Sequence, residues 1–282
     1  MTIATFGLNT TNTVQQWEDV YLSQQFPGVV SPGGINTLYV SNTDGIKQNK
    51  IVFRAPGIKT FFDGVGAVVI NSAILKWRRA NTVAGPSRNL EVRRLLVPFG
   101  ETQASWNSRY TGTEWGTAGA IGAGDVDSTI LASAAMPTSG GAYFNISGSG
   151  FTAWVAGIVD GSITTDFGFT VSLENPTTSG SGGFDFNSSN STNGLRPYLE
   201  IDYTTIAYPT VSTTDVTVNN LSGNAIVTIT LSSDALAGGV SGTINTADIT
   251  AIAGVDYTAQ TGVAFSIPEG SASGTITIPI LP

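Results

Sequence analysis

Hydrophobic and polar residues alternate along much of this chain, with the period of two that is typical of β-strands with one buried face. In the segment YLEIDY, residues 198–203, the apolar positions Leu199, Ile201 and Tyr203 alternate with more polar neighbours. Pro197 comes just before, and because proline has no backbone N–H it can only open such a strand or lie at an edge. We therefore predict a strand here that closes a first domain.

Further segments with strand character occur on both sides of this one. They lie at residues 37–41, 51–55, 67–77, 89–99 and 167–173, and then at 211–218, 225–232, 262–267 and 274–280. β-branched residues are frequent in them, and Gly, Asn, Asp and Ser fill the connections. The pattern predicts an all-β protein.

One segment has a helical period instead. Phe151, Trp154, Val155 and Ile158 fall at i, i+3, i+4 and i+7, and Gly161 follows where a helix would end. We predict a single short helix there, with Trp154 in the core.

The charge distribution divides the chain. Arg196 is the last of 12 Lys and Arg residues, whereas seven of the 20 acidic residues lie beyond it, so most of the net charge of −8 belongs to the tail. We expect a polar N-terminal arm without core positions at 1–16, a first domain at 17–204, a linker at 205–209 and a second domain at 210–282.

The absence of Cys and His excludes several classes of protein. Without them the chain has no disulfide framework, no thiolate or imidazole metal site, and no Ser-His or Cys-His catalytic pair. A pI of about 4.4 without a basic cluster argues against nucleic-acid binding. The acids of the first domain are scattered, with no recognisable glycosidase pair. We expect a protein that is not an enzyme.

The N-terminal sequence MTIATFGLNTTNTVQQWEDVYL has no positive region, apolar run or cleavage site of a secretory signal. No segment is long and apolar enough to cross a bilayer, so membrane insertion is not expected. Yet the composition resembles that of extracellular proteins. Three explanations stay open: a virion protein released by lysis, a protein exported by a C-terminal signal, or a chain whose leader has been removed.

Several motifs occur in a characteristic order over residues 17–204. They are WEDVYL, TLYVS, KIVFRA, INSAILKW, ETQASWNSRYTGTEWGTAGAIGAGD, FTAWVAGIVDGSITTDFGFTV and LRPYLEIDY. Together they resemble a DNRLRE-type domain, a jelly-roll family of the carbohydrate-binding-module kind. The resemblance implies an N-terminal jelly-roll sandwich with one short helix.

Residues 208–282 resemble the first part of a Calx-beta domain. The likeness rests on an Asp256-Tyr257 turn, a strand around Phe265 and a Glu269-Gly270 turn. It implies a smaller Ig-like sandwich. The family continues with an acidic segment and a last strand pair that do not follow here, so we expect a domain that is truncated or completed by another chain.

Candidate carbohydrate ligands lie in the loop-rich segment after residue 100. Sugar-binding modules stack an exposed aromatic ring on a pyranose and hold its hydroxyls with polar side chains. The residues that fit these roles are Asn107, Arg109, Tyr110, Glu114 and Trp115. The alternative is that Trp115 plugs the end of the sandwich and Tyr110 is an ordinary loop residue.

Two acidic pairs are candidate calcium ligands. Asp125 and Asp127 lie two residues apart among glycines, and Asp256 and Glu269 match acidic positions of the Calx-beta family. The first pair lacks EF-hand spacing, and solvated turn carboxylates are the alternative. No cofactor is expected to be required, and calcium would be structural only.

Taken together, the sequence favours a bacteriophage virion component, such as a capsid decoration, head fibre or tail-associated protein. Its expected partners are other virion proteins or further copies of itself in a homo-oligomer, together with a host-surface glycan. The alternative is a bacterial surface or secreted adhesin module that binds polysaccharide.

Overall fold

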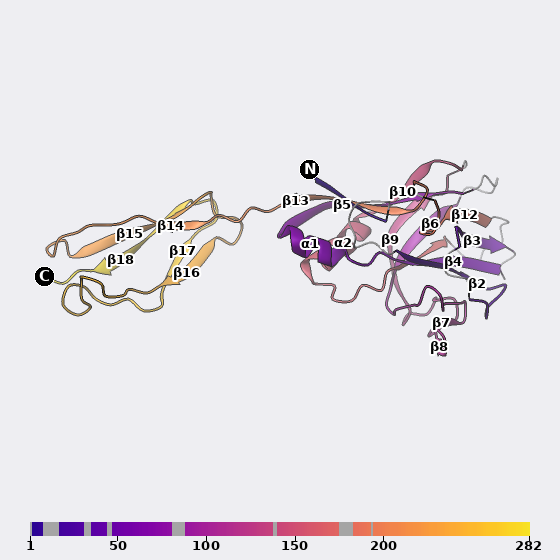
Figure 1. Ribbon diagram of the computed structural model, residues 1–282, viewed down its shortest axis with the longest axis horizontal. Helices are drawn as coiled ribbons and strands as arrows, with labels where there is room; N and C mark the ends of the chain where they lie inside the picture. The colour runs from indigo at the N-terminus through magenta and orange to yellow at the C-terminus, as the bar shows by residue number, and fades with distance from the viewer. Residues whose placement is uncertain are drawn as a thin grey trace. The chain divides into compact units, whose positions relative to one another are not determined.

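The computed structural model describes residues 2–7, 17–30, 35–43, 47–80, 88–137, 140–174, 183–192 and 194–282. The chain divides into two compact units, Met1–Ile206 and Ala207–Pro282 (Figure 1). Both consist mainly of antiparallel strands, which confirms the all-β fold class. The division falls inside the segment expected to be the linker.

The N-terminal unit is built on one large curled sheet. Its order is β1-β13-β5-β10-β9-β6-β11-β4-β3-β12, with β2 also paired to β4, while β7 and β8 form a separate hairpin. The strands are β1 (Thr2–Phe6), β2 (Glu18–Ser23), β3 (Thr37–Thr43), β4 (Lys47–Arg54), β5 (Val68–Arg78), β6 (Asn89–Leu95), β7 (Ser108–Tyr110), β8 (Thr113–Glu114), β9 (Val126–Ala135), β10 (Tyr143–Ser147), β11 (Phe169–Leu173), β12 (Gly183–Asn187) and β13 (Tyr198–Thr205).

Aromatic rings occupy the centre of the core between the layers of this curled sheet. The Phe53 ring lies 4.2 Å from that of Trp17, 5.6 Å from that of Trp77 and 4.8 Å from that of Phe169, measured between ring centroids. Such tilted and edge-on pairs add to the free energy gained by burying the rings. The layered, β-rich arrangement is compatible with a jelly roll.

Strand β13 confirms the strand expected at 198–203. Its inward residues Leu199 and Ile201 pair with Leu75 and Ala73 of β5, and all four are buried. Because side chains alternate between faces, the same strand leaves its polar residues outside.

The expectation that residues 1–16 hold no core position is wrong. Strand β1 pairs antiparallel with β13, and Phe6, at 2% exposed, lies opposite Leu199. Five residues are too few to show a clear period, and the pairing that stabilises β1 comes from a strand almost 200 residues away.

Helix α2 (Ser149–Asp160) confirms the predicted helix, with Phe151, Trp154, Val155 and Ile158 buried and Gly161 left-handed at φ 82°. The expectation of a single helix is wrong, since the described residues contain a second, α1 (Ile58–Val65). Helix α1 has only eight residues and no side-chain cap, so its sequence signal is weak. It packs against α2 (Figure 1). Within the described chain, no helix is both long and apolar enough to span a membrane.

The C-terminal unit holds two small sheets, ordered β14-β15-β18 and β16-β17. The strands are β14 (Val211–Thr213), β15 (Asn224–Leu231), β16 (Val240–Ile244), β17 (Val263–Ile267) and β18 (Ser273–Pro279). Its core contains Ile229, Leu231, Ala235, Ile267 and Ile276. The strand expected at 211–218 ends at residue 213, so residues 214–218 lie outside both sheets.

The pairing of β1 generates a prediction with a control on the same strand. Phe6→Ala removes a buried ring and should lower the free energy of unfolding of the N-terminal unit by about 3–5 kcal/mol. Ile3→Ala, at a position 55% exposed, should change it by less than about 0.5 kcal/mol. Urea unfolding followed by tryptophan fluorescence measures both, and equal effects would show that β1 is not part of the folded unit.

Candidate functional site

The residues predicted to bind carbohydrate lie on and around the β7–β8 hairpin. The Trp115 ring is not exposed as expected: the residue is 4% exposed and its Nε1–H donates to the Ser105 carbonyl at 2.9 Å. It packs in an apolar cluster with Phe99 and Trp106. Its burial favours the alternative in which Trp115 has a packing role.

The other predicted residues on and near the hairpin do not provide a fully exposed aromatic ring. Tyr110 is half-buried and lies so close to Gly100 that a Cβ there would be 3.0 Å from the ring. The Arg109 guanidinium lies 5.7 Å from the centre of that ring and donates to the Pro98 carbonyl at 3.3 Å. Asn107 and Glu114 are exposed. The hairpin therefore presents polar groups without the stacking surface that was expected.

The pair Asp125 and Asp127 has structural roles that require no ion. The Asp125 carboxylate is buried and accepts the backbone N–H groups of Gly116 and Thr117, each at 2.8 Å. Asp127 accepts the backbone N–H of Thr129 at 2.8 Å. These bonds organise the turn, and calcium at this place stays a prediction.

The structure places Asp256 and Glu269, the second acidic pair, at different points of the C-terminal unit, and calcium at either acid stays a prediction. The Asp256 carbonyl accepts the N–H of Leu281, just after β18, whereas Glu269 lies in the turn before β18. The strand between them has seven residues, which separates the two acids by about 20 Å. Among the described residues, no three acidic side chains gather as ligands for a metal ion.

A polar pocket of about 320 Å³, which we call the Glu101 pocket, is the strongest candidate site in the N-terminal unit. It forms where the end of β1, the start of β2, the loop after β6 and the segment between β12 and β13 meet. Its lining consists of Gly7, Trp17, Glu18, Glu101, Ser189, Asn190 and Arg196. No linear motif joins these positions, which explains why the sequence did not reveal the pocket.

Trp17 and Gly7 form one wall of the pocket. The Trp17 ring packs on Phe53 in the core, and its Nε1–H is buried without a partner among the described residues. A Cβ on Gly7 would lie 2.4 Å from the Trp17 ring, and Gly7 has a left-handed φ of 101°. This position therefore needs glycine, because any side chain would push the indole away.

The buried carboxyl group of Asp19 lies behind the pocket lining, where it is bonded to the backbone of Ser189. Asp19 is 3% exposed, its Oδ2 accepts the backbone N–H of Ser189 at 2.6 Å, and its Oδ1 has no partner among the described residues. Burial raises the pKa of Asp19 to about 7, although the bond from Ser189 acts in the opposite direction. At neutral pH the group is thus poised between its two protonation states.

Glu101 faces the same region from the opposite loop. Partial burial raises the pKa of Glu101 above its ordinary value and the charge of Glu18 adds to this, while a hydrogen bond from the Asp19 backbone lowers it. Glu18 is held by Arg54 at 2.6 Å, and Arg196 donates from Nε to the Ser191 carbonyl at 2.7 Å. The pocket thus combines carboxyl acceptors with cationic and amide donors.

This combination suits a ligand rich in hydroxyl groups. Carboxylates accept hydrogen bonds from hydroxyls, the guanidinium donates to them, and the Asn190 amide can do both. Binding sites of this kind place a few polar groups around a concave surface.

The raised pKa of Asp19 predicts a pH dependence of stability. Between 3.8 and about 7 the folded chain keeps a proton that the unfolded chain has lost, so stability should fall as the pH rises through this window, by at most about 4 kcal/mol. Asp19→Asn should remove most of the slope, as measured by urea unfolding at several pH values.

Asp63→Asn is the matched control, because Asp63 is an exposed acid paired with Lys59 on α1. It should keep the slope of the unmodified protein. If Asp19→Asn also keeps the slope, Asp19 is not the group that retains the proton.

Comparison with protein-family models finds no match to this chain, and comparison with curated proteins finds none either. The DNRLRE-type and Calx-beta resemblances therefore stay predictions drawn from motif order.

Proposed function

We propose that this chain is a non-enzymatic structural and binding protein whose N-terminal sandwich takes a carbohydrate-class ligand in the Glu101 pocket. The observation that carries the proposal is the convergence of Trp17, Glu101 and Arg196 on one concave surface. Arg196 supplies a cationic donor and Glu101 a carboxyl acceptor for ligand hydroxyls.

A binding role also fits the position of the carboxyl group whose pKa is near neutrality. Asp19 is buried and bonded to the backbone of Ser189, so it shapes the pocket from behind and does not present its oxygens at the surface. Glu18 is neutralised by Arg54. This arrangement favours holding a polar ligand over transferring protons to one.

The setting that we propose is a bacteriophage particle, with a bacterial surface adhesin as the alternative. A chain with 34 Gly residues and only 11% charged residues resembles extracellular proteins in composition, which supports this setting. Mass spectrometry of purified virions tests the setting independently of ligand binding. Detection of the chain as a stoichiometric component of the virion supports the bacteriophage particle. Detection only in the host envelope fraction supports the bacterial surface adhesin.

Substitutions in the pocket test the binding role. Glu101→Gln and Arg196→Ala should each weaken binding to an oligosaccharide by about tenfold or more, since each removes a charged hydrogen-bonding partner. A glycan array selects the oligosaccharide, and titration calorimetry measures its Kd.

Glu114→Gln, on the exposed β8, is the matched control and should leave the Kd unchanged. Loss of binding in Glu114→Gln with none in Glu101→Gln would move the site to the hairpin. Absence of binding to any glycan would refute the carbohydrate class.

A further inference from the structure

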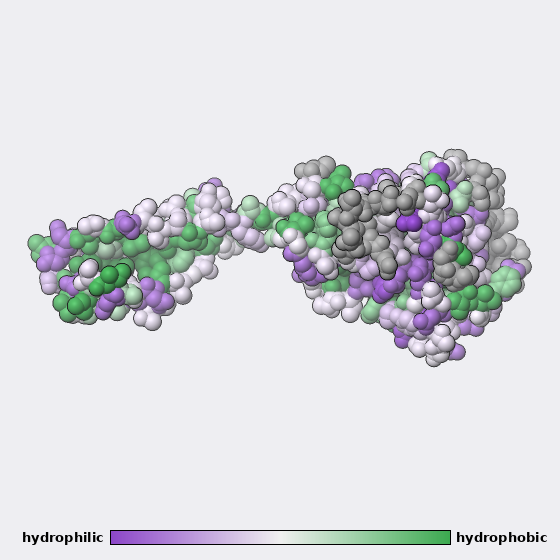
Figure 2. Space-filling model, in the orientation of Figure 1, coloured by the Kyte–Doolittle hydropathy of each residue, from purple (hydrophilic) through white to green (hydrophobic). Residues whose placement is uncertain are grey.

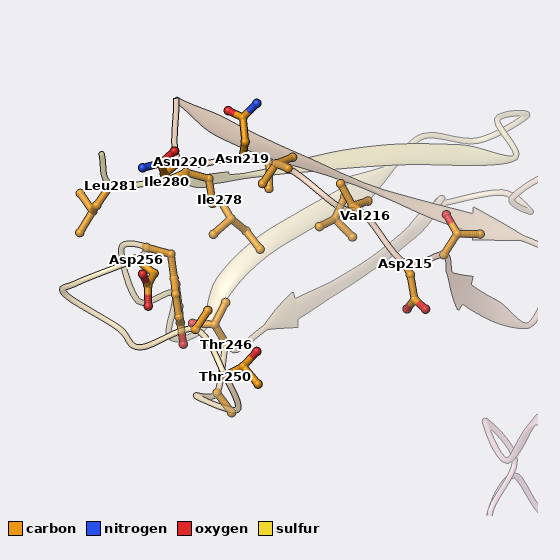
Figure 3. Close-up of a pocket in the computed structure, with 17 residues that line it drawn as sticks. Asp215, Val216, Asn219, Asn220, Thr246, Thr250, Asp256, Ile278, Ile280 and Leu281 are labelled. Carbon is orange, nitrogen blue, oxygen red and sulfur yellow. The ribbon is translucent and has the colours of Figure 1, made fainter. Parts of the chain in front are cut away.

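The C-terminal unit contains an apolar groove of about 690 Å³, and every residue of this unit is described. Its apolar lining comes from residues 216 and 218, from β15, from the end of β18 and the residues just after it, and from the loop at 247–257. Figure 3 shows Val216 and Ile278 on one side of the space and Thr246, Thr250 and Asp256 on the other. We call this feature the strand groove.

The strand groove exists because the sandwich is covered at one end and open at the other. On the inner face of the larger sheet, Ile229 and Ile276 are buried in a small core with Ile267 of the second sheet. Ala225 pairs with Ile278 further along the same face, where loops replace the second sheet. The inward alternation of β15 and β18 therefore continues past the region that strands β16 and β17 cover.

One wall of the groove has a free backbone. Residues 214–218 continue directly from β14, and their sequence alternates Asp215 and Thr217 with Val216 and Val218. They belong to no sheet, and their N–H and C=O groups make no hydrogen bond in this fully described unit. Residues 214–218 therefore form a template for strand addition, because their backbone groups are unpaired and their apolar side chains line a groove.

Large apolar side chains are also exposed around the groove. Leu221 is 84% exposed, Ile249 94% and Val255 64%, and each lies within a few residues of the lining. Hydrophobic residues gather on the viewed surface of this unit (Figure 2). An exposed apolar patch of this kind marks an interaction surface.

The charge of the unit specifies the partner. Residues 207–282 contain five acidic residues and no Lys or Arg, and two of the acids, Asp215 and Asp256, line the groove. An incoming segment with Lys or Arg beside its apolar residues would be attracted, and an acidic one repelled.

From these observations we propose that the C-terminal unit binds an extended cationic segment of a partner protein. The segment adds as a β-strand beside residues 214–218 and places alternate apolar side chains in the strand groove. Its intervening Lys or Arg side chains point away from the groove and are attracted by the net negative charge of the unit. This inference concerns a surface of its own and does not depend on the Glu101 pocket.

A second copy of this chain does not supply such a segment from its described residues. Its basic and apolar residues alternate in β4 and β5, both of which are paired on two sides within the sheet of the N-terminal unit. Withdrawing either strand would dismantle that core. The occupant is therefore a different chain.

The test uses the full-length protein and a labelled peptide of alternating Val and Lys, with fluorescence anisotropy as the readout. The peptide should bind, and the same peptide with Glu in place of Lys should not. Two further peptides carry N-methyl groups on the odd-numbered or on the even-numbered residues. One of the two should not bind, because its methyl groups remove the N–H donors that an added strand uses.

Two variants with the same added charge locate the site. Val216→Lys places a cation in the groove, whereas Ile226→Lys places one at an exposed position of β15 that does not line it. Val216→Lys should weaken binding by at least about tenfold, and Ile226→Lys should change it little. Equal effects, binding that tolerates both N-methylated peptides, or no binding would overturn the proposal. Self-association of the protein that is lost only in Val216→Lys would also overturn the proposal, because the strand groove would then be occupied by a second copy of this chain.

Discussion

The burial of Phe53 among aromatic rings is the interaction on which the N-terminal unit depends. Trp17, Trp77 and Phe169 reach it from separate parts of the chain, and their rings are tilted or edge-on to it. Because protein interiors are packed as densely as crystals, each ring has little freedom to move. Trp17 belongs both to this core and to the wall of the Glu101 pocket, so the geometry of the pocket follows from the packing of the core.

The carboxyl group of Asp19 is a polar group buried beside this apolar core. Placing an acid where water cannot reach it lowers the stability of the folded chain at neutral pH, and one of its oxygens is left without a partner among the described residues. Local departures of this kind concentrate at functional sites, because a site needs groups that a stable core would not include. The residue that lowers stability, Asp19, therefore lies next to the pocket that we propose as the ligand-binding site.

The two units complete their sandwiches to different extents. The N-terminal sheet curls far enough to cover a continuous core, with β1 and β13 contributing at one edge. The smaller C-terminal unit has its apolar core at one end, whereas at the other end its inward positions, including the buried Ala225 and Tyr257, line an open groove. Small domains bury a lower fraction of their surface, so an incomplete layer leaves a large part of the interior accessible to a partner.

The sequence by itself determined the features that depend on local periodicity. Alternation predicted β13, and a 3.6-residue period predicted α2, because each of these signals lies within one continuous segment. The recurrence of strand-like segments joined by turn residues predicted an all-β protein. The charge change after Arg196 indicated a second part, and the structure divides the chain at residue 206.

Only the tertiary structure decided which residues meet. Strand β1 forms because β13 pairs with it, and Trp115 is buried because it packs with Phe99 and Trp106. The Glu101 pocket assembles residues from four places in the chain. The strand groove likewise results from the register of β15 and β18 and from the limited reach of the second sheet. Such contacts depend on long-range pairing and packing, and a pattern within one segment holds no information about its distant neighbours.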